Sequence, residues 1–152
     1  MRPTYDEWAL QLAVHISLRS TCARRSVGAV LTNQRGHILS TGYNGRHAGA
    51  PHCNDYISDG TQPWLCPGVN LPSGTGLDQC EAIHAEQNAL LQCTDVYEIH
   101  ACYTTTSPCI TCVKLLLNTS CRRIIFHELY SHAHAQQLWV AQGREWVHLR
   151  RG

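Results

Sequence analysis

Four residues in the middle of the chain have the types and the spacing of a catalytic metal site. His84 stands two residues before Glu86, and Cys109 and Cys112 follow later, three residues apart. One imidazole and two thiolates fill three corners of a tetrahedral zinc site, and a fourth corner left open for water distinguishes a catalytic zinc from a structural one. Glu86 is not needed as a ligand, so its carboxylate can move protons. The pattern predicts zinc-assisted attack by water, with Glu86 as general acid and base.

The local sequence predicts that two helices begin at this metal. The proline before Cys109 suits the first turn of a helix, because it has no N–H group to leave unsatisfied. Cys109 and Cys112 then share one face at the helix start, where the positive end of the helix favours thiolate over thiol. His84 lies in a second helical run, residues 81–92. Because residues two apart on a regular helix diverge, His84 and Glu86 can meet one metal only near a helix end.

Other interpretations of these motifs stay open at this point. A Cys-x-x-Cys pair is also typical of a redox centre or of half a structural zinc knuckle, and His-x-Glu occurs often by chance. A non-catalytic, zinc-stapled binding module is therefore an alternative. The combined order of the motifs favours catalysis, because a carboxylate beside an open metal position has no obvious structural purpose.

Length and composition narrow the class of protein. The 152 residues suffice for one domain with a real core, so we expect a single domain over 1–152. A net charge of +1 gives no support to binding of long nucleic acid, although a small phosphorylated ligand needs only one or two cations. No apolar run is long enough to span a bilayer and no signal peptide is evident, so we expect a cytoplasmic protein. In that setting, nine cysteines indicate metal ligands and buried thiols.

The pattern of helices and strands predicts an α/β fold. Thr4 and Glu7 form a capping box at the first helix. Turn residues 33–36 join two strands in a hairpin. Later strands alternate with helices, which implies parallel pairing with the helices packed on the sheet. The expected helices are 5–16, 81–92, 109–118 and 131–142, and the expected strands are 27–32, 37–42, 99–105, 123–127 and 146–149.

A long stretch, residues 44–79, shows no clear periodicity. A structureless segment of this length inside a compact domain needs something to fix it. Four thiolates on a second, structural zinc would do so. The candidate ligands are Cys22, Cys53, Cys66 and Cys80, with His47 and His52 as substitutes. The alternative is four unrelated thiols.

We expect three further cysteines and two pairs of arginines to have structural roles and not catalytic ones. We expect Cys93, Cys102 and Cys121 to be buried small hydrophobes, because they lie in or beside apolar elements. The near-zero net charge favours solvated surface roles for the arginine pairs at 122–123 and 150–151.

Several short segments carry a likeness to a known family. They are 19–24, 27–30, 42–45, 52–53, 72–74, 84–89 and 107–112, and the likeness spans residues 8 to about 130. On these segments the chain resembles the deoxycytidylate (dCMP) deaminase family, and the H-x-E and P-C-x-x-C motifs are typical of zinc-dependent base deaminases. The resemblance implies a three-layer α/β/α fold with a mixed five-stranded sheet, usually assembled as a homohexamer.

The resemblance also implies an activity and substrate contacts. The activity is hydrolysis of dCMP to dUMP and ammonia, which supplies dUMP for thymidylate synthesis. Glu86 would take a proton from the attacking water, deliver it to ring N3 and later protonate the departing amine. Arg24 and Tyr130 match positions expected near the 5′-phosphate, and Asn44 matches a position expected at the deoxyribose. Alternatives within the same fold act on cytidine, dCTP or a tRNA base, and a tRNA enzyme would show a basic face.

Regulation is a further implication of the resemblance. Many members are activated by dCTP with Mg²⁺ and inhibited by dTTP, at a site close to Gly42, Tyr43 and Gly45. Many microbial members carry a second zinc near the long loop, consistent with the four cysteines named above. This chain departs from the family pattern at His47, where a proline is frequent, and its C-terminus is short.

Overall fold

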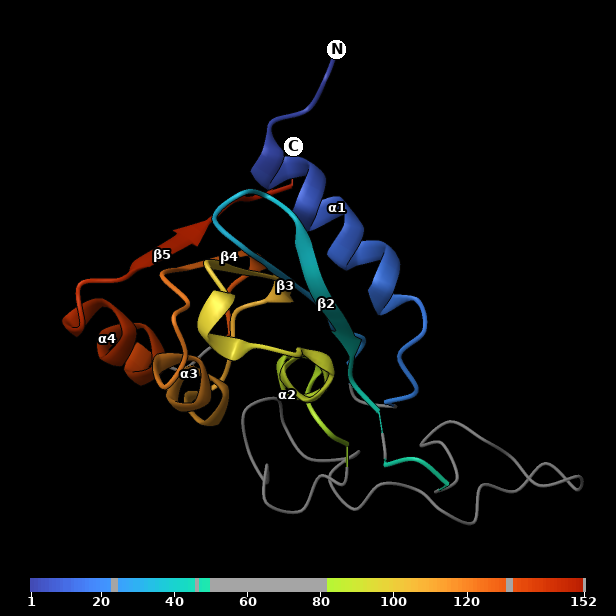
Figure 1. Cartoon of the computed structure of the whole chain (residues 1–152). Helices are drawn as coiled ribbons and strands as arrows, with labels where there is room; N and C mark the ends of the chain where they lie inside the picture. The colour runs from blue at the N-terminus through green and yellow to red at the C-terminus, as the bar shows by residue number, and fades with distance from the viewer. Residues whose placement is uncertain (23–24, 46, 50–81, 131–132, 152) are drawn as a thin grey trace, which may run out of the picture.

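Five strands form one mixed sheet in the computed structural model, which describes residues 1–22, 25–45, 47–49, 82–130 and 133–151 (Figure 1). The strands are β1 (Gly28–Thr32), β2 (Ile38–Tyr43), β3 (Ala101–Thr106), β4 (Arg123–Glu128) and β5 (Glu145–His148). Their order is β2-β1-β3-β4-β5. β1 runs antiparallel to both β2 and β3, whereas β3, β4 and β5 are parallel. The predicted mixed five-stranded sheet is confirmed.

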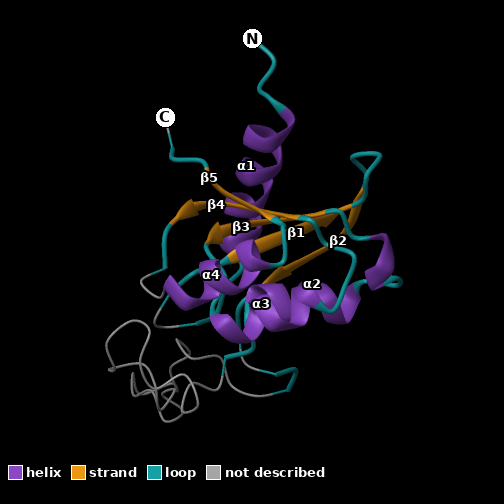
Figure 2. Ribbon diagram, turned by 90° about the vertical axis from the view of Figure 1, so that its left-hand side faces the viewer, coloured by secondary structure: helices purple, strands orange, loops and turns teal. Residues whose placement is uncertain are grey.

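Helices cover both faces of this sheet and make the predicted three layers (Figure 2). α1 (Tyr5–Ser17) lies on one face, and α2 (Ala85–Gln92), α3 (Ile110–Leu117) and α4 (Ala133–Ala141) lie on the other. A short 3₁₀ helix, η1 (Val96–Glu98), precedes β3. Each face has its own hydrophobic core. β1 and β3 are buried along their whole length, as expected for strands covered on both sides.

Two glycines let helices approach the sheet closely. A Cβ on Gly28 would lie 2.0 Å from the Ala13 carbonyl oxygen of α1. On the opposite face, a Cβ on Gly42 would lie 2.3 Å from the Ala85 carbonyl oxygen of α2. Since real Cβ atoms essentially never approach other atoms this closely, glycine at each position is what allows the helix to pack there.

The start of α2 differs from the predicted helix 81–92. Before Ala85 the chain is extended, because Ile83 forms a β-bridge with Gly45 through two backbone hydrogen bonds of 2.7 and 3.1 Å. His84 is therefore the N-cap of α2, with φ −69° and ψ 153°. The expected helix 109–118 likewise begins one residue late, with Cys109 as its N-cap.

Arg123 is not the solvated surface residue that composition predicted. Its guanidinium makes two hydrogen bonds, of 3.0 and 3.1 Å, to the Asp6 carboxylate, and a third of 2.7 Å to Glu145. Tyr103 donates its hydroxyl to Asp6 at 2.6 Å. Arg123 holds the pKa of Asp6 below its ordinary value, chiefly through these hydrogen bonds. This network ties α1 to β3, β4 and β5.

The burial of the other cysteines agrees only in part with the sequence. Cys102 and Cys121 are fully buried, as predicted, whereas Cys93 is only half-buried at the end of α2. Within the described part of the chain, no helix combines the length and apolar character needed to cross a membrane.

Candidate active site

His84, Cys109 and Cys112 come together at the N-terminal ends of α2 and α3. The Nδ1 atom of His84 lies 3.3 Å from Cys112 Sγ and 3.4 Å from Cys109 Sγ. All three donor atoms lie within 4.8 Å of one another. In a tetrahedral zinc site, ordinary Zn–N and Zn–S bond lengths place a ring nitrogen ~3.6 Å from a ligand sulfur. The donor types and their spacing therefore fit a zinc ion.

The N-cap positions explain how this geometry arises from the sequence. His84 and Cys109 both have extended backbones just outside a helix, whereas Glu86 lies in the first turn of α2. A side chain at the N-cap does not follow the helical periodicity, so His84 and Glu86 can lie close together although they are two residues apart. The Gln87 side chain accepts the His84 backbone N–H at 2.9 Å and so fixes this end of the helix.

The two cysteines are electrostatically unequal in the protein without metal. Hydrogen bonds from the Cys112 thiol and from the His84 ring lower the pKa of Cys109 to about 4. The neighbouring Cys109 sulfur and burial raise the pKa of Cys112 well above its ordinary value. A cation at this position stabilises both thiolates together, because it supplies the charge that the pair lacks.

Glu86 is a buried carboxylate beside the cluster. Its side chain is only 4% exposed. Burial raises its pKa above the ordinary value, because the charged form is poorly solvated. Its Oε1 atom accepts a hydrogen bond of 3.0 Å from the Thr104 hydroxyl of β3. A carboxylate whose pKa is raised in this way holds a proton more readily than an exposed one, which suits a general acid and base.

Asn44 has a structural role that the sequence did not reveal. Its Oδ1 atom accepts the Val27 backbone N–H at 2.8 Å and the Ser20 hydroxyl at 2.5 Å. Its Nδ2 atom donates to the Arg25 carbonyl oxygen at 2.6 Å. Asn44 is 7% exposed and thus holds together the segments that flank β1 and β2.

Tyr130 lies beside the segment that leads into the cysteine ligands. Its backbone N–H donates to the Ser107 hydroxyl at 2.6 Å, two residues before Cys109. The Arg25 guanidinium lies 5.2 Å from the centre of the Tyr130 ring. The structure therefore brings Tyr130 and Asn44 together through Arg25, whereas the predicted Arg24 lies outside the described residues.

The residues predicted to bind an effector lie along β2 and just after it. Gly42 packs against the backbone of α2, and Gly45 bridges Ile83. Tyr43 is 39% exposed. Of the four cysteines predicted to bind a structural zinc, the structure describes only Cys22, whose side chain is half-buried. Outside the described residues lie Arg24, Cys53, Cys66, Cys80 and the substitute His52.

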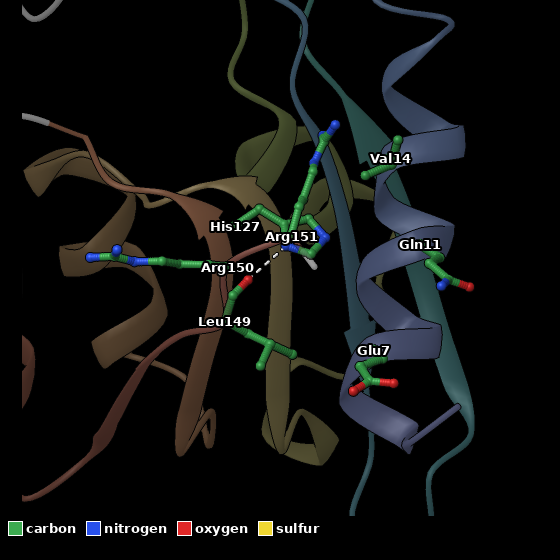
Figure 3. Close-up of a pocket in the computed structure, with 7 residues that line it drawn as sticks. All are labelled: Glu7, Gln11, Val14, His127, Leu149, Arg150 and Arg151. Atoms are coloured by element: carbon green, nitrogen blue, oxygen red, sulfur yellow. Dashed lines mark hydrogen bonds between the residues drawn. The ribbon is translucent and has the colours of Figure 1, made fainter. Parts of the chain in front are cut away.

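A hollow of about 610 Å³ lies on the face of the sheet opposite the His84, Cys109 and Cys112 cluster (Figure 3). It is formed by the side of α1 that carries Glu7 and Gln11, and by the C-terminal segment around Leu149. The His127 ring donates from Nδ1 to the Leu149 carbonyl oxygen at 2.7 Å. The charged side chains at its rim, including Arg150, are exposed. This hollow is therefore separate from the metal-ligand cluster.

Comparison with known proteins identifies the family. Residues 3–128 match the sequence model described as the cytidine and deoxycytidylate deaminase zinc-binding region. The chain belongs to the cytidine and deoxycytidylate deaminase family. The family and the cluster of one histidine and two cysteines together support zinc as the metal of this deaminase-family chain.

Individual relatives agree with this assignment. The deoxycytidylate deaminase of Schizosaccharomyces pombe is 35% identical over 148 residues, which cover 93% of this chain and 43% of that protein. The deoxycytidylate deaminase of Mycobacterium phage D29 is 38% identical over 126 residues, covering 82% of this chain and 95% of that protein. The chain thus spans less than half of the yeast relative and nearly all of the phage relative.

A solved structure shows the same fold. The dCMP deaminase from cyanophage S-TIM5, in complex with dCMP and dUMP, superposes with a TM-score of 0.72. The match covers 98% of this chain and 99% of that one, at 24% sequence identity. At this identity the likeness concerns the fold alone.

Proposed function

We propose that this chain hydrolyses dCMP to dUMP and ammonia. The observation that carries the proposal is the buried Glu86 carboxylate beside three donor atoms with the spacing of zinc ligands. Relatives at 35% and 38% identity are deoxycytidylate deaminases, and a structural neighbour binds dCMP and dUMP, which supports dCMP as the substrate.

Four residues carry out metal binding and proton transfer in the proposed reaction. His84, Cys109 and Cys112 hold the zinc, which when bound activates a water molecule by lowering its pKa towards neutrality. Glu86 takes the proton that the attacking water gives up and delivers it to ring N3. Glu86 then takes the remaining proton of the hydroxyl group added at C4 and passes it to the departing amine. The C4–N bond breaks, ammonia leaves, and the C4 carbonyl of a uracil ring remains. Burial of Glu86 keeps competing water away from this proton transfer.

Substrate binding is assigned to the residues gathered around Arg25. Asn44 uses one Nδ2 hydrogen on the Arg25 carbonyl, and its second Nδ2 hydrogen can donate to the deoxyribose. Tyr130 lies near the 5′-phosphate, where Arg24 and the Arg25 guanidinium supply positive charge. An Arg24→Ala variant tests this assignment, because it should impair turnover of dCMP far more than turnover of deoxycytidine. Equal losses on both substrates would remove Arg24 from the phosphate site.

Allosteric control is a further part of the proposal. We expect activation by dCTP with Mg²⁺ and inhibition by dTTP at Gly42, Tyr43 and Gly45. The exposed Tyr43 ring offers a face on which a nucleotide base can stack. Assays of dCMP turnover with and without each triphosphate test this, and an unchanged rate with both would contradict it.

The remaining expectations concern the whole assembly. We propose a single domain over 1–152, a second zinc held by Cys22, Cys53, Cys66 and Cys80, a cytoplasmic homohexamer, and no nucleic-acid or membrane partner. Metal analysis of fully loaded protein should return two zinc ions per chain. One zinc ion per chain would leave only the catalytic site.

The substrate is tested by offering zinc-loaded protein a panel of nucleotides. The panel contains dCMP, deoxycytidine, CMP, dCTP and unmodified tRNA, with the products identified by chromatography. Conversion of dCMP to dUMP in clear preference to the others supports the proposal. Preference for another member of the panel, or no product from any of them, contradicts it.

A further inference from the structure

The sheet supplies one buried hydroxyl to the Glu86 carboxylate. Thr104 of β3 is fully buried, and its hydroxyl donates to Glu86 Oε1 at 3.0 Å. The Thr106 carbonyl oxygen also lies 3.0 Å from this hydroxyl, which carries one hydrogen. An ionised carboxylate is the stronger acceptor of the two, so Glu86 receives that hydrogen.

We propose that Thr104 is a positioning residue that holds the Glu86 carboxylate in the orientation needed for proton transfer. This inference rests on the function proposed above, because it assigns a role relative to Glu86. Thr104 acts through Glu86 and is not itself assigned any contact with the substrate.

The position of Thr104 suits such a role because β3 is held on both sides. Thr104 is paired with Ala29 of β1 and with Phe126 of β4, in the middle of the sheet. Glu86, in contrast, extends from the first turn of α2, and its long side chain has several rotatable bonds. A bond from the rigid sheet to Oε1 fixes one carboxylate oxygen and so leaves Oε2 to face the reacting atoms.

When a metal is bound, the position of Glu86 depends more strongly on its hydrogen bond with Thr104. A protonated Cys112 thiol would lower the pKa of Glu86, as a neighbouring hydrogen-bond donor does. A metal-bound cysteine is a thiolate and has no hydrogen to donate. With Cys112 as a thiolate, Glu86 keeps the Thr104 hydroxyl of β3 as a side-chain donor.

The first test removes the hydroxyl and keeps the side-chain shape. Thr104→Val should lower kcat for dCMP roughly 10- to 100-fold, the range expected for a lost hydrogen bond to a charged group. KM should stay within about threefold of the wild-type value, because Thr104 is not placed at the substrate. Thr104→Ser restores the hydroxyl and should bring kcat back to within about threefold of wild type.

A matched control separates positioning from support of the helix. Ser40 of β2 is also buried, and its hydroxyl donates to the Ala89 carbonyl oxygen of α2 at 2.8 Å. Ser40→Ala therefore removes another hydrogen bond between the sheet and the same helix, away from Glu86. Its kcat should stay within about threefold of wild type. Zinc content and urea midpoints of all variants restrict the comparison to folded, zinc-loaded protein.

A readout independent of turnover is the crystallographic order of Glu86. In zinc-loaded wild type, the carboxylate should occupy one orientation against Thr104, and in Thr104→Val it should rotate or become disordered. An ordered, unmoved Glu86 in Thr104→Val would overturn the inference. A wild-type kcat in Thr104→Val, an equal loss in Ser40→Ala, or no rescue by Thr104→Ser would also overturn it. If wild-type protein deaminates none of the cytosine nucleotides, the proposed function falls and this inference falls with it.

Discussion

Gly42 is the point at which β2 and α2 come closest, and an added methyl group there should disturb the active site. In a Gly42→Ala variant, the new Cβ would lie 2.3 Å from the Ala85 carbonyl oxygen and 2.4 Å from the Ala89 nitrogen. Ordinary van der Waals contact begins at 3.4 Å, so α2 has to retreat by about 1.1 Å, the difference between 2.3 and 3.4 Å. Because His84 caps this helix and Glu86 lies in its first turn, both would move with it.

The expected effect on activity is large. A displacement of about 1 Å in a catalytic group can cost on the order of 100-fold in rate. We therefore expect kcat/KM of Gly42→Ala for dCMP to fall roughly 100-fold. Overpacking should also lower the free energy of unfolding by about 1–3 kcal/mol. Steady-state kinetics at saturating zinc and urea unfolding measure the two effects separately.

Gly28 provides the control on the other face of the sheet. A Cβ on Gly28 would lie 2.0 Å from the Ala13 carbonyl oxygen, so the Gly28→Ala variant strains α1 and not α2. It should lose at least as much stability as Gly42→Ala, while kcat/KM of its folded fraction stays within about threefold of wild type. A wild-type kcat/KM in Gly42→Ala, or an equal loss of activity in Gly28→Ala, would show that the close contact between Gly42 and α2 does not position the active site.

Three further predictions concern stability and metal binding. Arg144 donates hydrogen bonds of 2.8 to 3.4 Å to four carbonyl oxygens at and just after the end of α3. Urea unfolding of Arg144→Met should therefore show a free energy of unfolding lower by about 2–4 kcal/mol. A loss below about 1 kcal/mol would contradict this. Arg123 lowers the pKa of Asp6, so the stability that Asp6 adds is present above about pH 4 and is lost as pH falls further. The free energy of unfolding should be lower for Asp6→Asn than for wild type at neutral pH, and this difference should disappear in acid. A difference that does not change with pH would contradict the assigned role of Asp6. Cys112→Ser should bind one zinc fewer per chain, whereas the buried Cys121→Ser should keep the wild-type zinc content.

Local patterns in the sequence were sufficient for much of the fold and for the cluster of His84, Cys109 and Cys112. Turn signals, apolar runs and helical spacing predicted the five strands and four α-helices of the described residues. The ligands were predictable because His84, Cys109 and Cys112 have a diagnostic spacing. Because residues two apart on a strand face the same way, the sequence of β3 could also have placed Thr104 on the same face as Cys102. It could not have shown that this face contacts Glu86.

What the sequence did not predict depends on contacts between distant segments. The late start of α2 follows from the pairing of Ile83 with Gly45, which lies far earlier in the chain. The ion pair of Arg123 is with Asp6, 117 residues away in the sequence. No local pattern encodes such partners, so composition alone assigned Arg123 to the surface. The assignments of Arg24 and of the cysteines within 50–81 stay predictions, because these residues lie outside the described structure.

The most direct test of the central claim compares zinc-loaded wild type with Glu86→Gln for release of ammonia from dCMP. We expect continuous conversion of dCMP to dUMP by the wild type, with one ammonia released for each dUMP. Glu86→Gln should keep the zinc content of the wild type and lose turnover by at least about 100-fold, because the amide cannot carry the proton. Turnover by Glu86→Gln near the wild-type rate, or a zinc-loaded wild type that leaves dCMP unchanged, would contradict it.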